Sequence, residues 1–168
     1  MEGLSITKRK VVFIVAPEEF NDYELLHPKE ILEQAGVEVV TASTRKGKCT
    51  GMKGTVVEAI LSLDEVNSSY FDAIIAVGGA GALNFLSANK TLINLFLKFK
   101  KEGKIVSAIG RARHALYNAG LFGTNFTWGS AAEIHDNVIA ARPPSTTPGW
   151  TSRKFGNLLL SYLSKYEH

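Results

Sequence analysis

The feature of the sequence that most constrains its fold is a strand that passes into a helix through a single residue, Gly110. Residues 104–109 form a short, mainly apolar run with β-branched side chains, which is typical of a buried strand. Residues 111–119 carry Ala, Leu and Arg at helical spacing, and they are followed by Gly120, a residue type that commonly ends helices. So sharp a turn usually needs a strained backbone or a positive φ angle. We therefore expect an elbow at Gly110, at the carboxyl end of a sheet, where open α/β folds keep their chemistry.

Apolar runs typical of buried strands alternate with helical patterns along the rest of the chain. The predicted strands are residues 10–16, 37–42, 55–57, 72–77 and 104–109. The predicted helices run from Asn21 or Asp22 to Gly36, over 89–102, over 111–119 and over 155–166, with one helical turn at 63–66. Residues 43–54 and 123–148 are predicted as loops, the second with one or two short strands, such as 137–140. This alternation predicts an α/β fold with a mainly parallel sheet and helices on both faces.

Composition and charge narrow the class of protein. With 168 residues, 45% of them hydrophobic, the chain is long enough for one well-buried domain and too short for two, so we expect a single domain over 1–168. The net charge of +3 gives little support to nucleic-acid binding, and basic groups such as Lys8–Lys10 fall where strand or helix ends should meet water. No apolar run is long enough for a membrane span, Met1–Ser5 does not resemble a signal peptide, and a single cysteine fits a reducing compartment. We expect a cytoplasmic protein that binds neither nucleic acid nor membranes.

Several separated stretches, taken together, resemble the ThiJ/PfpI family, the family of the Parkinson's-linked protein deglycase, which belongs with the class I glutamine amidotransferase-like folds. They are the residues after the first strand, the 72–77 strand with its glycines, the elbow, and the start of the last helix, namely 19–25, 71–79, 110–120 and 151–153. The resemblance covers most of residues 10–166, except a different segment from about Thr124 to Trp150. It implies a flavodoxin-like three-layer sandwich that commonly forms homodimers.

The resemblance also implies a site that this chain matches only in part. The usual site of the family is a cysteine at the elbow, held by a glutamate from the first loop, with a histidine nearby. Glu19 matches the glutamate position, but the Cys-His-Gly-Pro run of the family falls on Gly110–Arg113, so the nucleophile is absent. A further family histidine falls near Trp128–Gly129 and is also absent. We therefore expect no thiol-dependent activity of the family, whether deglycase, glyoxalase or peptidase.

Charged and glycine residues at the elbow form the candidate ligand site, which comprises Glu19, Gly78, Gly79, Gly110, Arg111 and Arg113. Without a thiol, the Glu19 carboxylate needs another partner, and Arg111 or Arg113 can meet a carboxylate with two parallel hydrogen bonds. The alternative is that all three side chains are solvated. Because the arginines face the positive end of the elbow helix, Glu19 or a bound phosphate or carboxylate would offset their charge. Gly78–Gly79 match the place where related enzymes offer backbone donors to an oxyanion, or they form only a tight turn.

The remaining reactive residues indicate no second chemistry. Cys49 is expected in the loop over 43–54, in the region where some family members carry a peripheral cysteine near a dimer contact. The histidines share no metal-ligand spacing, so we expect no metal site; they are His27, His114, His135 and His168.

Three functions remain open from the sequence. The favoured one is a non-catalytic member of the family, a pseudoenzyme, that binds a small anionic ligand or a protein partner through an Arg/Glu-lined pocket at the elbow. One alternative is a hydrolase or lyase that uses Glu19 as a general base while Arg111 holds an anionic substrate. Another is a chaperone-like scaffold with exposed apolar surface. We expect a homodimer and no cofactor.

Overall fold

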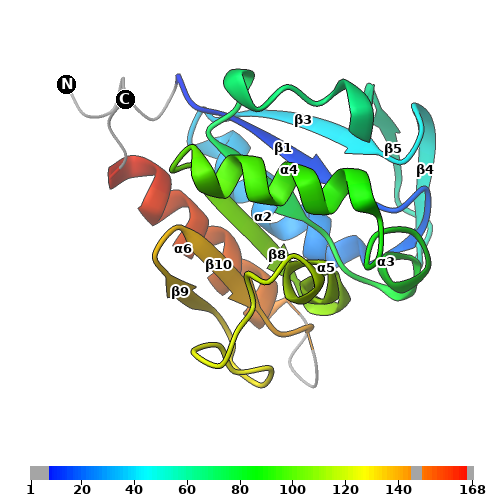
Figure 1. Cartoon of the computed structure of the whole chain (residues 1–168). Helices are drawn as coiled ribbons and strands as arrows, with labels where there is room; N and C mark the ends of the chain where they lie inside the picture. Colours follow the sequence, from blue (N-terminus) through cyan, green and yellow to red (C-terminus); the bar gives the residue numbers. More distant parts are fainter. Residues whose placement is uncertain (1–7, 145–148, 166–168) are drawn as a thin grey trace.

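The fold is an α/β sandwich built on a seven-stranded sheet (Figure 1). The computed structural model describes residues 8–144 and 149–165. The strands of this sheet are β1 (Lys10–Ile14), β3 (Glu38–Ser43), β6 (Leu61–Ser62), β7 (Ala73–Ala76), β8 (Ile105–Ile109), β9 (Glu133–His135) and β10 (Val138–Ala141). Their order is β6-β3-β1-β7-β8-β10-β9, and every neighbouring pair is parallel except β10 and β9. This sheet confirms the predicted flavodoxin-like class.

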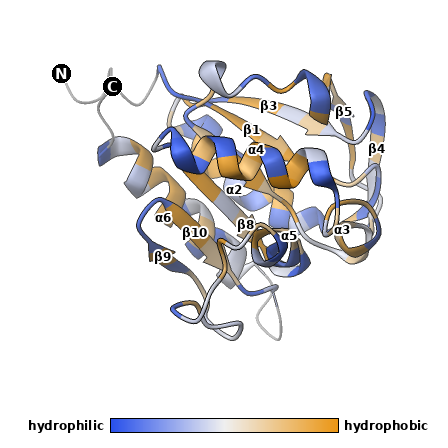
Figure 2. Cartoon of the chain, viewed as in Figure 1, coloured by the Kyte–Doolittle hydropathy of each residue, from blue (hydrophilic) through white to orange (hydrophobic). Residues whose placement is uncertain are grey.

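Helices cover both faces of the sheet, as predicted. They are α2 (Asp22–Gln34), α3 (Ala80–Phe85), α4 (Lys90–Lys101), α5 (Arg113–Asn118) and α6 (Trp150–Lys165). Helices α2 and α6 pack together on one face, whereas α4 and α5 cover the other. Figure 2 shows the polar side of α4 turned outward and the apolar strands enclosed. Within the described ranges, no helix is both long and apolar enough to cross a membrane.

The central strands are buried on both faces because their alternate side chains belong to two separate cores. In β1, Val12 and Ile14 pack beneath α4 and α5, while Val11 and Phe13 pack beneath α2 and α6. All four are fully buried. A strand with this environment needs apolar residues at every position, which is why it was recognisable as a continuous run.

Helices α2 and α6 approach closely at Gly156. A Cβ built on Gly156 would lie 2.8 Å from the Cα of Pro28, so any side chain there would push the two helices apart. Helix α2 continues through Pro28, which is buried against this contact. The close contact between Gly156 and Pro28 therefore holds α2 against α6. The first turn of α2, which lies next to Pro28 along the helix, carries residues of the site described below.

The segment predicted as a loop over 43–54 instead contains a strand, β4 (Gly47–Gly51). It pairs antiparallel with β5 (Val56–Ala59) and parallel with β2 (Glu18–Phe20), forming a small second sheet. Cys49 is fully buried in β4 opposite Val57, not in an open loop. Helix α3 and the short strands β2 and β6 were also not predicted. Predictions for Met1–Ser5, for 145–148 and for the end of the last helix beyond residue 165 lie outside the described residues.

Candidate functional site at the strand-to-helix elbow

The elbow predicted at Gly110 is present. Strand β8 ends at Ile109, Gly110 has a φ of +63°, and one 3₁₀ turn over Gly110–Ala112 leads directly into α5. This is the left-handed region, which residues with a side chain rarely adopt, so glycine forms the turn with less backbone strain than another residue would. The end of β7 lies alongside, since a Cβ on Gly78 would be 2.8 Å from the backbone N of Arg111.

The carboxyl group beneath the elbow belongs to Glu24, in the first turn of α2. Glu24 is 1% exposed, and its Oε1 accepts a hydrogen bond of 2.9 Å from the backbone N–H of Gly78. A Cβ added to Gly110 would lie 2.6 Å from Oε1 and 2.7 Å from Oε2 of Glu24. Asn21 holds this turn, because its side chain accepts from the Glu24 N–H at 3.0 Å and its own N–H donates to Gly78 O at 2.9 Å. The Glu24 carboxyl therefore occupies the space that a side chain at position 110 would need.

This placement corrects the expectation for Glu19. Glu19 is exposed, has a φ of +59°, and lines a separate pocket together with the basic turn over 45–48. The chain buries Phe20 in the core at this point, which leaves Glu19 in solvent. The sequence did hold a signal for Glu24, because it stands one turn before the buried Pro28 on the inward stripe of α2. A charged residue on a buried stripe needs a partner inside the protein.

Burial changes the protonation of Glu24. Desolvation raises the pKa of its carboxyl from 4.5 to about 8, while the Gly78 N–H and the positive charges of Arg113 and Arg111 lower it by less. At neutral pH the carboxyl is therefore mainly protonated and uncharged. In that state it can donate a hydrogen bond as well as accept one. An anion can then approach the elbow without meeting a buried negative charge.

Arg113 is buried and is not paired with Glu19. It is 6% exposed; its Nε donates to Gly110 O at 2.8 Å, and its Nη1 donates to Trp128 O at 2.5 Å. Its guanidinium carbon lies 4.9 Å from the centre of the Trp128 ring. Burial lowers the pKa of Arg113, and the nearby Glu24 raises it by less. Arg113 thus ties the segment around Trp128 to the elbow.

A small pocket of about 210 Å³ opens at the elbow. It brings together Arg111, which is exposed, and Gly79, two residues that the sequence placed in one site. Gly78 and Gly110 both border Glu24 in its wall. Its lining comprises Asn21, Glu24, Met52, Gly79, Ala80, Arg111 and Pro143. Three of these lining residues, Asn21, Glu24 and Met52, were not predicted from the sequence.

None of the other reactive side chains lines this pocket. The Sγ of Cys49 lies 3.6 Å from Gly47 O, inside the small sheet. Each described histidine has a local partner: His27 with Ser152, His114 with Trp128, and His135 with Glu133. His168 lies outside the described residues. Across residues 8–144 and 149–165, no group of three or more His, Cys, Asp or Glu side chains is arranged to hold a metal ion.

The sequence of this chain is similar to those of known proteins. A sequence model described as the DJ-1/PfpI family matches residues 9–150. The chain belongs to the DJ-1/PfpI family. An uncharacterized protein of Methanocaldococcus jannaschii is 38% identical over 112 residues, which are 67% of this chain and 55% of that protein. A deglycase of Pyrococcus horikoshii is 32% identical over 167 residues, covering 89% of this chain and 99% of the relative.

A solved structure agrees on the fold. The ThiJ/PfpI domain protein from Brachyspira murdochii superimposes with a TM-score of 0.86 at 22% identity, covering 94% of this chain and 98% of that one. Within the DJ-1/PfpI family, this chain has Gly110 where the resemblance places the elbow cysteine, and its single cysteine is Cys49 in β4. The chemistry available at its elbow is therefore that of Glu24, Arg111 and the backbone.

Proposed function

We propose that this DJ-1/PfpI protein carries out no thiol chemistry at its elbow and instead binds a small anionic molecule in the elbow pocket. The contact between Gly110 and Glu24 carries this proposal. The space into which an elbow side chain would project holds a carboxyl group, 2.6 Å from the Cβ position. Relatives of this chain include proteins named deglycases, but its own thiol is fully buried in another sheet.

The chemistry of the pocket favours a carboxylate-bearing ligand of small size. Arg111 presents an exposed guanidinium at the wall, and arginine binds carboxylates with two parallel hydrogen bonds. Glu24, protonated at neutral pH, adds a hydrogen-bond donor instead of a repelling charge. A volume of about 210 Å³ lies below the range of about 300–1,000 Å³ that is usual for drug-sized ligands.

A hydrolase or lyase without a cysteine is the second candidate, and one observation favours it. The pKa of about 8 for Glu24 is close to neutrality, where a general acid or base works best. Glu24 also shares its pocket with Arg111, whereas Glu19, the base expected from the sequence, lines another pocket. A chaperone-like scaffold, a homodimer and a cytoplasmic location stay predictions.

Turnover and binding assays separate these candidates. We expect no consumption of methylglyoxal above the buffer rate, and the same result for Cys49→Ser, because the only thiol is enclosed in β4. We expect lactate to bind, and Arg111→Met to weaken its binding at least about tenfold, while Lys98→Met, an exposed change on α4, leaves it unaltered.

Three outcomes would change the assignment. Turnover that disappears in Cys49→Ser would contradict the absence of thiol chemistry. Turnover that persists in Cys49→Ser and disappears in Glu24→Gln would establish the hydrolase or lyase. Lactate binding that is unchanged in Arg111→Met would reject the elbow pocket as the anion site.

A further inference from the structure

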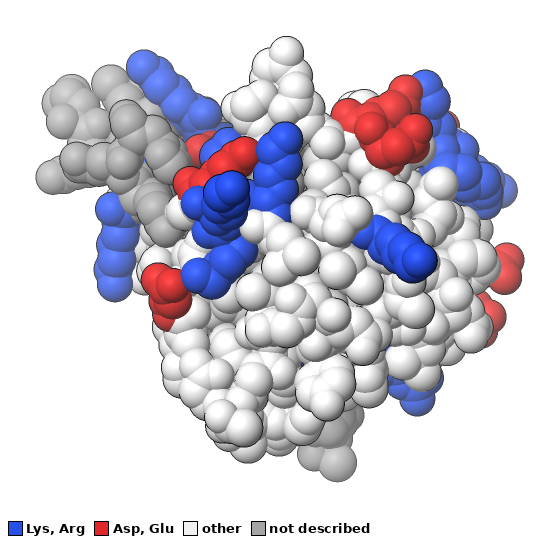
Figure 3. Space-filling view, in the orientation of Figure 1, with Lys and Arg blue, Asp and Glu red and all other residues white. Residues whose placement is uncertain are grey.

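A second polar pocket lies at the opposite edge of the sheet from the elbow. It has a volume of about 530 Å³ and lies where β1, β7 and β8 begin. Its lining holds four basic and two acidic residues, namely Lys8, Arg9, Lys10, Lys104, Glu38 and Asp72. Figure 3 shows basic side chains gathered over the start of β1 and the end of α4, beside acidic ones. The pocket thus has an excess of two positive charges and the size of a small-molecule site.

Arg9 is the exceptional residue of this pocket, because it is buried and incompletely paired. It is 6% exposed, although the sequence placed Lys8–Lys10 in solvent. Its Nη1 lies 3.9 Å from Asp72 Oδ1, which is an ion-pair distance but too long for a hydrogen bond. Its Nε and Nη2 are buried and have no hydrogen-bond partner within the described part of the chain. Arginine does not lose its proton in proteins, so it cannot become neutral to relieve this burial.

The two atoms without partners form one edge of the guanidinium. The N–H bonds of Nε and Nη2 point in parallel to the same side, and this fork matches two oxygens of a carboxylate or phosphate. Asp72 does not fill the fork, since it faces Nη1 and its Oδ2 accepts from the Lys10 backbone N–H at 3.0 Å. An oxyanion from outside the described chain is therefore the group that this edge can bind.

The other cations around the pocket have acidic neighbours or are open to solvent. Lys10 Nζ lies 3.4 Å from Glu38 Oε2, and Lys104 Nζ lies 3.7 Å from Glu102 Oε1. Lys8 is exposed and has no ion pair with any residue of the described ranges. Arg9 and Lys8 are therefore the two charges that remain for a ligand.

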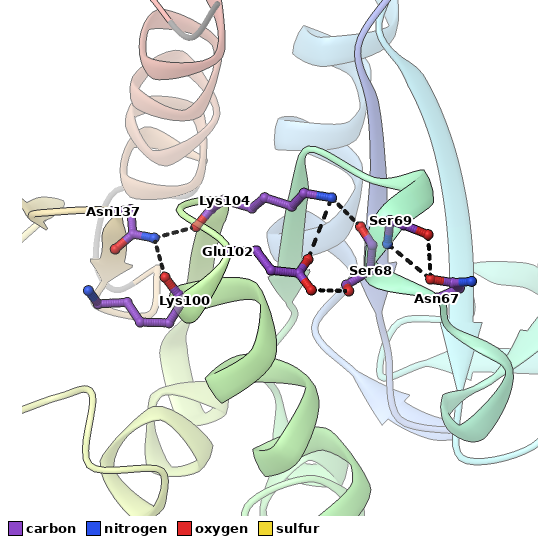
Figure 4. A network of polar contacts seen from close by, with 7 residues as sticks. All are labelled: Asn67, Ser68, Ser69, Lys100, Glu102, Lys104 and Asn137. Carbon is purple, nitrogen blue, oxygen red and sulfur yellow. Dashed lines mark hydrogen bonds and ion pairs between the residues drawn. The ribbon is translucent and has the colours of Figure 1, made fainter. Parts of the chain in front are cut away.

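The wall formed by Lys104 is held in place by polar contacts (Figure 4). Lys104 Nζ donates to Ser68 O, and Ser68 Oγ donates to Glu102 Oε2 at 3.1 Å. Asn137 Nδ2 donates to Lys100 O at 3.2 Å and to Lys104 O at 2.6 Å. The pocket thus has a wall that is set before any ligand arrives, which lowers the entropic cost of binding.

We propose that this amino-terminal pocket binds a small phosphate monoester, with two phosphate oxygens on the Nε–Nη2 edge of Arg9. A dianionic phosphate matches the excess of two positive charges in the lining. The pocket exceeds the size of a phosphate alone, and Tyr70, which is 68% exposed and stands in the lining, offers an aromatic ring to the rest of the molecule. The site is independent of the elbow and of the function proposed for it.

Titration with inorganic phosphate and with phenyl phosphate, at constant ionic strength, tests the proposal on the full chain. We expect saturable binding of both, tighter for phenyl phosphate, with NMR shifts concentrated at the backbone amides of Tyr70–Asp72. Arg9→Met should weaken binding at least about tenfold, and Arg9→Lys should weaken it as well, because lysine keeps the charge but lacks the fork. Lys98→Met, which removes one exposed positive charge outside both pockets, should leave the phosphate-induced shifts at Tyr70–Asp72 intact.

Thermal unfolding distinguishes a ligand site from a structural arginine. In phosphate-free buffer Arg9→Met should unfold at or above the temperature of the wild type, because Arg9 is charged, buried and poorly paired. Phosphate should then raise the unfolding temperature of the wild type alone. The proposal is overturned if phosphate binding does not saturate, if it survives Arg9→Met, or if Arg9→Met unfolds early while phosphate leaves the wild type unchanged. The NMR titration of the wild type tests the site without any variant. If phosphate shifts other amides but not those of Tyr70–Asp72, the site is rejected as well.

Discussion

The two ends of the central sheet each bury one ionisable residue, and they accommodate it in different ways. At the carboxyl end, Glu24 lies under the elbow, accepts a hydrogen bond from Gly78, and has a pKa of about 8. At the amino end, Arg9 is buried to a similar degree with two nitrogen atoms unpartnered in the described chain. A carboxyl group can become neutral by taking a proton, whereas a guanidinium keeps its charge. The acid is therefore accommodated by losing its charge, whereas the base keeps its charge, and we propose that a bound phosphate completes its pairing with Asp72.

The pH dependence of stability gives the largest expected contrast between the two ends. Below pH 4.5 the Glu24 carboxyl is protonated in both the folded and the unfolded state. Between pH 4.5 and about 8 the unfolded state loses the proton while the folded state keeps it, so stability falls as pH rises. The slope approaches about 1.4 kcal/mol per pH unit, for a total on the order of 5 kcal/mol across the window. Below pH 4.5 and above about pH 8 the contribution of Glu24 no longer changes with pH, because the folded and unfolded states then carry the same number of protons.

Urea unfolding of Glu24→Gln across this pH range measures that contribution. We expect the stability difference between the variant and the wild type to grow in favour of the variant as pH rises from 4.5 to 8. Arg9→Met is the matched change at the other end, and its difference from the wild type should not vary with pH in this window. A flat difference for Glu24→Gln would mean that Glu24 is ionised in the folded protein.

Gly110→Cys tests whether a side chain at the elbow competes with the Glu24 carboxyl for the same space. We expect a loss of about 3 kcal/mol in stability, because the new Cβ meets both a φ of +63° and the Glu24 carboxyl at 2.6 Å. Gly103→Cys is the control, since Gly103 has a φ of +75° with nothing within 4 Å of its Cβ position, and should lose only about 1 kcal/mol. Equal losses for both variants would show that strain alone matters. A rapidly reacting, low-pKa thiol in Gly110→Cys would show that the pocket still supports catalysis.

The smallest expected effect concerns the helix caps. Asn21 caps α2 at the elbow and Asn89 caps α4 on the other face, each accepting a backbone hydrogen bond of 3.0 Å. Replacement of either by Ala should cost about 1 kcal/mol. Only Asn21→Ala should also change the titration of Glu24 in carboxyl-detected NMR, because Asn21 positions that turn. An identical Glu24 titration in both variants would contradict this role.

The elements that could be predicted from the sequence are those in which nearly every residue is apolar because nearly every residue is buried. Strands β1, β7 and β8 are continuous apolar runs because both of their faces are covered. The elbow was equally recognisable, since one glycine separates a strand from a helix. Strand β4 was missed because Gly47–Gly51 carries no apolar run, and its extended form depends on pairing with β5 across a turn.

The residues proposed for the site from the sequence agree only in part with the lining of the elbow pocket, which includes Gly79 and Arg111 but not Glu19. Glu19 matched the motif, yet the contact with Gly110 comes from Glu24, whose direction follows from the helical turn that Asn21 starts. Arg9 was assigned to solvent because it stands in a basic run, and only the tertiary packing around Phe71 and Asp72 reveals its burial. Side-chain direction at the ends of strands depends on neighbours that are remote in sequence, so these details required the structure.

The enclosure of Cys49 in β4 also decides how the chain meets oxidants. A thiol with no exposed surface is reached by peroxide only when the small sheet opens, so its oxidation would report local unfolding. Among residues 8–144 and 149–165, the exposed sulfur-containing residue is Met52, which is 52% exposed and stands in the lining of the elbow pocket. Conversion of its thioether to a sulfoxide makes an apolar wall polar, and methionine sulfoxide reductases reverse it. Redox sensitivity at this elbow thus belongs to a methionine at its rim.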